Sequence, residues 1–198
     1  MTLTVSERHS DGKLEILTAA ARAFAEHGYH GMSMRDLARA TGRAPATLYN
    51  YFDSKEELLY TLQRESFDEL IASAEKALEG VEDPDARLRA FVTSHVRYFT
   101  TNPDVMRVLV HEASALPPQH RGDIRARKQR YFDLGHDTVR ALVANANLDA
   151  IEVERRTYSL FGMLNWMWGW YEADRHGSPE TVADTIVRMA RGGLLAPA

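Results

Sequence analysis

Apolar residues recur at spacings of three and four positions along nearly the whole chain, and no run alternates between apolar and polar residues for more than a few positions. The first spacing places apolar side chains on one face of an α-helix, whereas a half-buried strand requires the second. Leu14, Leu17, Ala21 and Phe24 begin the helical pattern, and Gly28 ends it. We therefore predict an all-α fold, and 198 residues suffice to bury its core without disulfides or a structural metal.

Capping residues and prolines divide this pattern into about nine predicted helices. Ser33 with Asp36, and Ser54 with Glu57, have the spacing of a capping box, which marks a helix N-terminus. Proline marks three further N-termini, because the first helical residue needs no backbone N–H donor. The predicted helices cover residues 11–28, 33–42, 44–51, 54–80, 118–147 and 149–175, and three more begin at Pro84, Pro103 and Pro179.

The composition and the motifs exclude most catalytic classes. Without cysteine, the chain has no disulfide framework, thiolate zinc site, iron–sulfur cluster or cysteine nucleophile. It also lacks HExxH, G-x-S-x-G, a phosphate-binding glycine loop and the paired Glu-x-x-His motifs of a di-iron bundle. His95, His111 and His120 fall on different predicted helices, so we interpret them as surface or core histidines. We predict a binding protein without catalytic residues, cofactor or metal and, since no apolar leader or membrane-length stretch is present, a cytoplasmic one.

Residues 33–52 have the pattern of a helix-turn-helix, in which a first helix braces a second that enters the major groove of DNA. Leu37, Ala38 and Leu48 are apolar where the two helices must pack, and Gly42 lies in the turn. The second helix carries small, flat or hydroxyl-bearing side chains, which can approach base edges and phosphates closely. Because the helices before residue 53 are also short, we predict a DNA-binding domain over residues 1–53 and a helical bundle over residues 54–198.

The stretch from Ile16 to Leu59 resembles the N-terminal domain of TetR-family transcriptional regulators. The resemblance rests on four linked segments: AARAFAEHGY at 20–29, SMRDLA at 33–38, TLYNYF at 47–52 and SKEELL at 54–59. It implies a homodimer whose two N-terminal domains bind the half-sites of a palindromic operator in double-stranded DNA.

The resemblance also implies which residues contact DNA. By position in the motif, the residues facing bases are Arg35, Pro45, Ala46 and Tyr49, and those holding the DNA backbone are Ser33, Thr47, Asn50, Tyr51 and Lys55. Arg43 stands in the turn where the family commonly has an apolar residue, and it would add a phosphate contact. Tyr51 has a second interpretation, packing in the core.

For the C-terminal domain, the resemblance implies an effector pocket inside the bundle and a dimer interface formed mainly by the last two helices. In the predicted helix 149–175, Met163, Trp166 and Trp170 form one stripe, while Trp168 points elsewhere. A helix with aromatic residues on several sides is expected to be buried on several sides. The stripe fits packing in the core or at an interface as well as a cradle for a ligand.

A basic segment at 121–132 supplies further candidate effector residues. Arg127 and Arg130 flank Ile124 and Tyr131 on the predicted apolar side, and arginine at the mouth of an apolar pocket suits an anion with an apolar tail. The order HEASALPPQHRGDIRARKQRYF at 111–132 followed by LFGMLNWMWGWY at 160–171 resembles the C-terminal domain of the acyl-CoA-responsive branch of the TetR family. The resemblance implies a CoA thioester as effector, bound by Arg127, Arg130, Tyr131, Met163, Trp166 and Trp170.

These observations predict a repressor that its effector releases from DNA, and two alternatives stay open. The first is a repressor of an efflux or catabolic operon that senses drugs or aromatic ligands, with Glu112 or Glu172 offsetting a cation. The second is a helical enzyme or carrier for acyl-CoA with an incidental helix-turn-helix.

The net charge of −4 is unevenly distributed along the chain. Residues 1–55 hold seven Lys and Arg against six Asp and Glu, so the excess of acidic residues lies in the predicted ligand-binding part. We expect few phosphate contacts per subunit and a shallow salt dependence of DNA binding.

Overall fold

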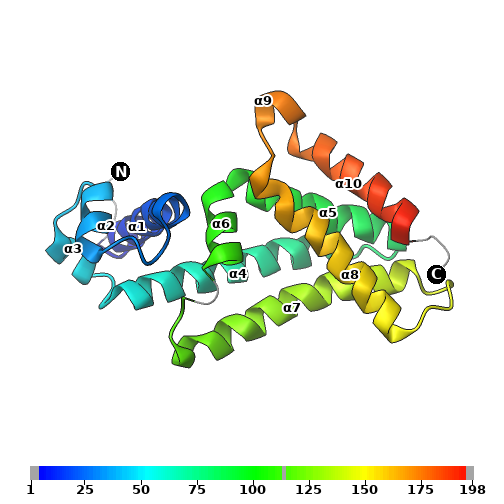
Figure 1. Ribbon diagram of the computed structural model, residues 1–198, viewed down its shortest axis with the longest axis horizontal. Helices are drawn as coiled ribbons and strands as arrows, with labels where there is room; N and C mark the ends of the chain where they lie inside the picture. Colours follow the sequence, from blue (N-terminus) through cyan, green and yellow to red (C-terminus); the bar gives the residue numbers. More distant parts are fainter. Residues whose placement is uncertain (1–4, 113–114, 195–198) are drawn as a thin grey trace. The chain divides into compact units, whose positions relative to one another are not determined.

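The computed structural model describes residues 5–112 and 115–194, which form helices joined by turns and contain no strand (Figure 1). In chain order the helices are α1 (Val5–His27), α2 (Met34–Ala40), α3 (Pro45–Tyr49), α4 (Lys55–Leu78), α5 (Pro84–Thr101), α6 (Pro103–His111), α7 (Pro118–Leu142), α8 (Ala150–Asn165), the 3-10 helix η1 (Trp166–Gly169), α9 (Ala173–His176) and α10 (Pro179–Leu194). The predicted all-α fold is confirmed. Among these residues no helix is both long and apolar enough to cross a bilayer.

Most helix ends lie where the capping residues predict them. The Ser33 hydroxyl accepts a hydrogen bond from the Asp36 N–H, and the Asp36 carboxylate accepts one from the Ser33 N–H, which completes the predicted capping box. Gly28, Gly42 and Gly80 follow α1, α2 and α4 with φ angles of 73°, 65° and 68°. Glycine adopts this left-handed backbone without strain, so it ends a helix readily.

The prediction of one continuous helix over 149–175 is wrong. The α-helix ends at Asn165, residues 166–169 form a tighter 3-10 turn, and α9 is a separate short helix. A regular helix would place Trp168 on the side opposite to Trp166 and Trp170, whereas the turn brings the ring centroids of Trp166 and Trp168 to 5.3 Å and buries Met167 to 2% exposure. Gly169, a poor residue for a helix interior, lies within this turn and packs against the Trp166 ring.

The chain forms two compact units, and each has its own core. The first comprises residues up to Ser66 together with Asp104–Ile124, so it contains α1, α2, α3, the first part of α4, α6 and the start of α7. Phe24, Leu48 and Phe52 are each 0–1% exposed in its core. The division between the units falls inside α4. The DNA-binding domain over residues 1–53 stays a prediction.

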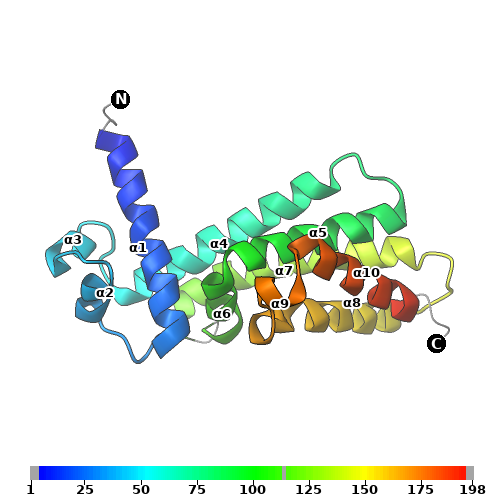
Figure 2. The same ribbon diagram turned by 90° about the horizontal axis from the view of Figure 1, so that it is seen from above.

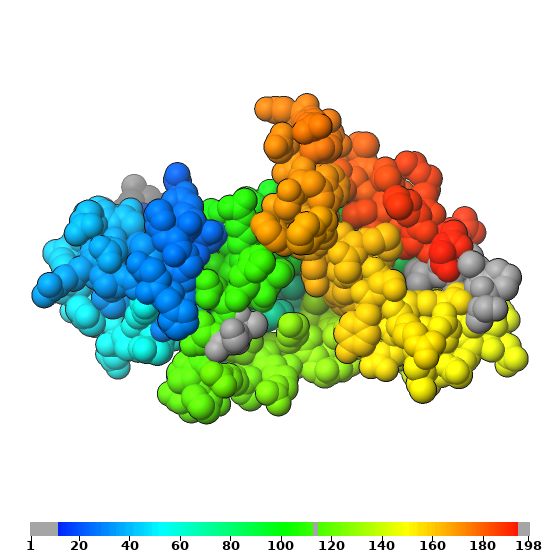
Figure 3. Space-filling view, viewed as in Figure 1, coloured from blue at the N-terminus to red at the C-terminus, as the bar shows by residue number. Residues whose placement is uncertain are grey.

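The second unit comprises Phe67–Pro103 and the chain from Arg125 onward. In it α10 lies along α5, as Figure 2 shows, and α8 packs against both helices. Leu88, Phe91 and Leu160 are fully buried in its core. The residues of η1 and α9, orange in Figure 3, form an exposed ridge beside α10, which is red.

Candidate DNA-binding and effector sites

In the first unit, α2 and α3 form the predicted helix-turn-helix. Leu37, Ala38 and Leu48 are at most 1% exposed and hold the two helices together. The turn between them closes with a hydrogen bond of 2.9 Å from the Arg43 N–H to the Ala38 carbonyl. This packing fixes α3 on α2 and leaves the opposite face of α3 to solvent.

The structure leaves six of the ten predicted DNA-contacting residues exposed and four half-buried. The exposed ones are Ser33, Arg35, Pro45, Ala46, Tyr49 and Asn50, and the half-buried ones are Arg43, Thr47, Tyr51 and Lys55. Tyr49 is 51% exposed, so its ring is accessible from solvent. A β-carbon at Gly12 would lie 2.5 Å from the Tyr51 hydroxyl oxygen, so Tyr51 packs closely against α1.

Lys55 holds the turn that precedes α2. Its Nζ donates hydrogen bonds to the carbonyls of Tyr29 at 3.0 Å and Met32 at 2.8 Å, and it lies 4.2 Å from the centroid of the Tyr29 ring. Two of the three ammonium protons are therefore used inside the protein. At most one proton is left for an external anion.

Two other predicted backbone contacts also have partners within the unit. Arg43 forms an ion pair with Glu15 on α1. The Ser33 hydroxyl also donates to the Asp36 carboxylate at 2.5 Å, and this bond is the main cause of a lowered pKa at Asp36. A phosphate at these positions would compete with, or add to, these contacts.

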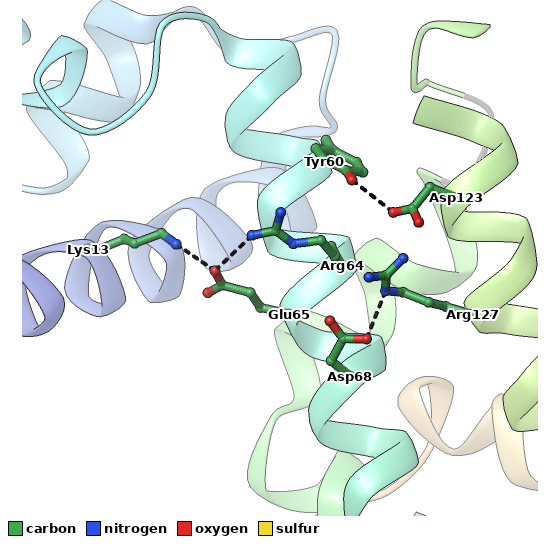
Figure 4. Close-up of polar contacts among 7 residues, drawn as sticks. All are labelled: Lys13, Tyr60, Arg64, Glu65, Asp68, Asp123 and Arg127. Carbon is green, nitrogen blue, oxygen red and sulfur yellow. Dashed lines mark hydrogen bonds and ion pairs between the residues drawn. The ribbon is translucent and has the colours of Figure 1, made fainter. Parts of the chain in front are cut away.

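In the first unit, polar side chains of α1, α4 and the first turns of α7 contact one another, as Figure 4 shows for Lys13, Tyr60, Arg64, Glu65 and Asp123. Lys13 and Arg64 both contact the Glu65 carboxylate, at 2.5 and 3.4 Å. The Tyr60 hydroxyl donates to Asp123 at 2.8 Å, and this hydrogen bond raises the pKa of Tyr60. The Tyr60 ring also stacks on His120 at a centroid distance of 4.0 Å.

In the second unit, the predicted stripe of Met163, Trp166 and Trp170 lines an open groove of about 770 Å³ between α8, η1 and α10. The expectation that the tryptophans are buried on several sides is wrong within one subunit, since Trp166 is 62% and Trp170 is 38% exposed. The end of α8 at Asn165 leaves their rings on the outside of the bundle.

The structure does not bring the predicted arginines to this groove. Arg127 Nε lies 2.8 Å from Asp68, as Figure 4 shows, and Arg130 lies 2.6 Å from Glu75, so both face acidic residues of α4. Tyr131 points into the interior, where its hydroxyl lies 2.9 Å from Nδ1 of His95. The predicted effector residues therefore lie in three different places: the groove, the acidic side chains of α4 and the interior of the unit.

Two residues, His95 and Glu112, make contacts that the sequence did not predict. His95 is 1% exposed in the core, on the same helix face as Phe91, Val92 and Phe99, and the spacing of those residues would have indicated this position. Glu112 at the end of α6 accepts a hydrogen bond from the Tyr29 N–H at 3.0 Å, and no sequence pattern indicates this contact between residues 83 positions apart.

Two family models match the chain over complementary parts. Residues 16–61 match the model for bacterial regulatory proteins of the tetR family, and residues 81–194 match a tetracyclin repressor-like C-terminal domain. The first match contains the helix-turn-helix, and the second contains the tryptophan groove and the interior His95.

Curated relatives and solved structures match over most of the chain. The transcriptional activator FasR of Mycolicibacterium smegmatis is 26% identical over 91% of this chain and 81% of its own length. The transcriptional repressor KstR2 of Rhodococcus jostii is also 26% identical, over 95% of this chain and 93% of its own length. The structure of AibR in complex with isovaleryl coenzyme A and operator DNA is 26% identical, covers 90% of this chain and 97% of that one, and has a TM-score of 0.79.

Proposed function

Because the chain belongs to the TetR family of bacterial transcriptional regulators, we propose that it is a homodimeric repressor that leaves a palindromic operator when an acyl-CoA thioester binds. Its curated relatives are DNA-binding regulators and not enzymes, so the protein is a transcriptional regulator. The observation that carries the proposal is the exposed face of α3 on a buried helix-turn-helix core.

For the DNA contacts, the proposal assigns Arg35, Pro45, Ala46 and Tyr49 to base edges. All four are exposed in the first unit, which supports this assignment. Ser33, Arg43, Thr47, Asn50, Tyr51 and Lys55 are assigned to the DNA backbone. Of these residues, Arg43, Tyr51 and Lys55 also make contacts within the first unit. We therefore expect few phosphate contacts per subunit.

For the dimer, the proposal assigns α8 and α10 to the interface with a second copy. Ile151 and Tyr158 on α8, Trp166 in the adjoining η1 and Met189 on α10 are 58–65% exposed, and Trp166 and Met189 line the same groove. Contiguous exposed apolar surface of this kind marks an interaction site. A β-carbon at Gly162 would meet nothing within 4 Å, which leaves room for close approach of a partner helix.

For the effector, support comes from AibR, which was crystallised with isovaleryl coenzyme A and operator DNA. The multidrug alternative loses support at Glu112, since its carboxylate is already hydrogen-bonded to Tyr29. The relatives include both a repressor and an activator, and we favour repression because binding of a ligand that prefers the DNA-free conformation weakens DNA binding directly.

The test is DNA binding by the purified full chain. A pool of random DNA is enriched on the protein, and the enriched sequence is labelled for fluorescence anisotropy with CoA thioesters of increasing acyl size. We expect a palindromic site and a loss of anisotropy with at least one thioester.

Tyr49→Ala should weaken operator binding by about 10-fold or more, since one good base contact is worth about 1–3 kcal/mol. Leu14→Ala is the control, because Leu14 is 60% exposed in the same unit but is not a predicted contact. Unchanged binding by Tyr49→Ala would contradict the assignment of α3, and steady binding with every thioester would contradict the effector class only.

A further inference from the structure

The interior of the second unit contains a polar pair in aromatic surroundings. His95 on α5 and Tyr131 on α7 are 1% and 4% exposed, and His95 Nδ1 lies 2.9 Å from the Tyr131 hydroxyl oxygen. The ring centroid of His95 lies 4.7 Å from that of Phe99, and that of Tyr131 lies 5.5 Å from Phe91. The pair is thus enclosed by apolar rings.

The second ring nitrogen of His95, Nε2, is buried and has no hydrogen-bond partner among the described residues. When the Tyr131 hydroxyl donates to Nδ1, Nε2 carries a proton without an acceptor; in the other tautomer it is an acceptor without a donor. The Leu164 carbonyl favours the protonated ring but does not meet the geometry of a hydrogen bond to Nε2. Since buried polar groups are almost always paired, Nε2 is a candidate donor to an acceptor that is better placed than the Leu164 carbonyl.

Neither member of the pair carries a charge at neutral pH. Burial lowers the pKa of His95 to about 3 and raises the pKa of Tyr131 well above its usual value. A carboxylate beside them would be buried without a cation, which is strongly unfavourable. A carbonyl oxygen is neutral and accepts one hydrogen bond from Nε2, so the chemistry of the pair favours a carbonyl over an acid.

A series of packed aromatic rings connects Tyr158 on α8 to this pair. Tyr158 is 59% exposed, and its ring centroid lies 4.8 Å from that of Phe132. Phe132 lies 5.5 Å from Phe161, and Phe161 lies 5.9 Å from Tyr131. An apolar ligand that displaces the Phe132 and Phe161 rings would follow this route to His95.

We propose that the effector inserts its apolar tail among these rings of α5, α7 and α8 and that its carbonyl oxygen accepts a hydrogen bond from Nε2 of His95. This inference rests on the proposed function and deepens it, because it names the group that is recognised: a neutral carbonyl of a thioester or ketone. It also places the acyl end of the ligand in the interior and not in the tryptophan groove.

Matched probes test the role of the carbonyl in isothermal titration calorimetry with the full chain. Hexanoyl-coenzyme A and hexyl-coenzyme A differ only in the carbonyl, which is a methylene group in the second; 2-octanone and octanoate compare a ketone with an acid. We expect hexanoyl-coenzyme A to bind about 10-fold more tightly than hexyl-coenzyme A, and 2-octanone to bind more tightly than octanoate.

Three variants connect this preference to His95. His95→Leu should abolish the preference for the carbonyl. His95→Gln, whose amide nitrogen takes the place of Nε2, should retain the preference, and its binding would show that the core still folds. His176→Leu is the matched control, because His176 lines the outer groove with its ring centroid 5.1 Å from that of Trp170, and it should leave the preference unchanged.

Equal binding of the thioester and the thioether, a preference that survives His95→Leu, or the absence of binding by all four probes would overturn the inference. Failure of the proposed function has a different signature in operator anisotropy. If the carbonyl preference depends on His95 but no probe releases the DNA, the binding site at His95 is supported and the proposed release of DNA by the ligand is contradicted. If a thioester releases the DNA without dependence on His95, only the inference about the carbonyl fails.

Discussion

The Oε1 atom of Glu112 accepts a hydrogen bond from the backbone N–H of Tyr29 at 3.0 Å, and this bond ties the end of α6 to the turn between α1 and α2. The carbonyl of Glu112 also accepts a hydrogen bond from the Gln63 side chain on α4 at 3.1 Å. Lys55 holds the same turn through the carbonyl of Tyr29. The approach to the helix-turn-helix is therefore fixed by one acidic and one basic residue.

Glu112→Ala should destabilise the first unit by about 2 kcal/mol, because a half-buried N–H loses a charged acceptor. Operator binding should weaken as well, since the turn directly precedes the cap of α2. Glu112→Gln keeps an oxygen acceptor and should restore most of both properties. Thermal unfolding and operator anisotropy check the effects, with the exposed Glu154→Ala as control; equal behaviour of Glu112→Ala and Glu154→Ala would contradict a structural role for the bond.

Lys55→Met should lower the free energy of unfolding by about 2 kcal/mol, because the Tyr29 and Met32 carbonyls lose charged donors and the Tyr29 ring loses its cation. The methionine retains the apolar part of the side chain, so packing is little changed. Arg39→Met is the control, since Arg39 is largely exposed and its ion pair with Asp36 contributes little. Urea unfolding distinguishes the two variants; if Lys55→Met is as stable as Arg39→Met, Lys55 serves DNA binding alone.

The fold of this chain was predictable wherever a local signal decides the structure. The capping box at Ser33 and the prolines at 84, 103 and 179 each locate a helix start through the backbone N–H groups of a single turn. The break after Asn165 was not predictable in this way, because apolar spacing continues through it. There, the packing of the tryptophan rings and Met167 decides the conformation.

The DNA-binding site was predictable from the sequence, and the effector site was not, for a similar reason. The helix-turn-helix is contiguous in sequence, so its spacing predicts which residues share a surface. The effector residues lie far apart in sequence, and α7 is long enough that Arg127 faces Asp68 while Tyr131, four positions later, points to His95. The partner of each side chain depends on the neighbouring helices, which periodicity along one helix does not reveal.

Asp36 should make stability depend on pH in the acid range. The hydrogen bond from the Ser33 side chain is the main cause that lowers the pKa of Asp36 in the folded protein. The folded pKa is therefore below the ordinary value of 3.8 that applies to the unfolded chain. Stability from this group is therefore present above about pH 4 and is lost as the pH falls through the folded pKa. Urea unfolding should show Asp36→Asn less stable than the native protein at pH 7, with the difference diminishing at pH 3. A difference that is constant with pH would contradict this origin.

Gly135→Ala should destabilise the second unit by about 1–3 kcal/mol through overpacking. A β-carbon there would lie 2.8 Å from Cε2 of Phe161 and 3.0 Å from Cζ of Phe91, closer than carbon atoms approach without strain. The gain in helix propensity, about 1 kcal/mol, does not offset this. Gly122→Ala is the matched control, because Gly122 also lies in α7 and a β-carbon there meets nothing within 4 Å. Thermal unfolding should show a loss for the first variant and none for the second.

Trp166→Ala should weaken the dimer by 10-fold or more while leaving the subunit folded. The side chain is 62% exposed in one subunit, so its removal leaves no cavity in the core, whereas a buried tryptophan at an interface commonly contributes about 2 kcal/mol or more. Sedimentation velocity over a concentration series measures the dissociation constant, and Leu14→Ala, which removes an equally exposed side chain from the first unit, is the control. A dimer of unchanged affinity that no longer binds a CoA thioester would instead identify the groove of Met163, Trp166 and Trp170 as the cradle for the ligand.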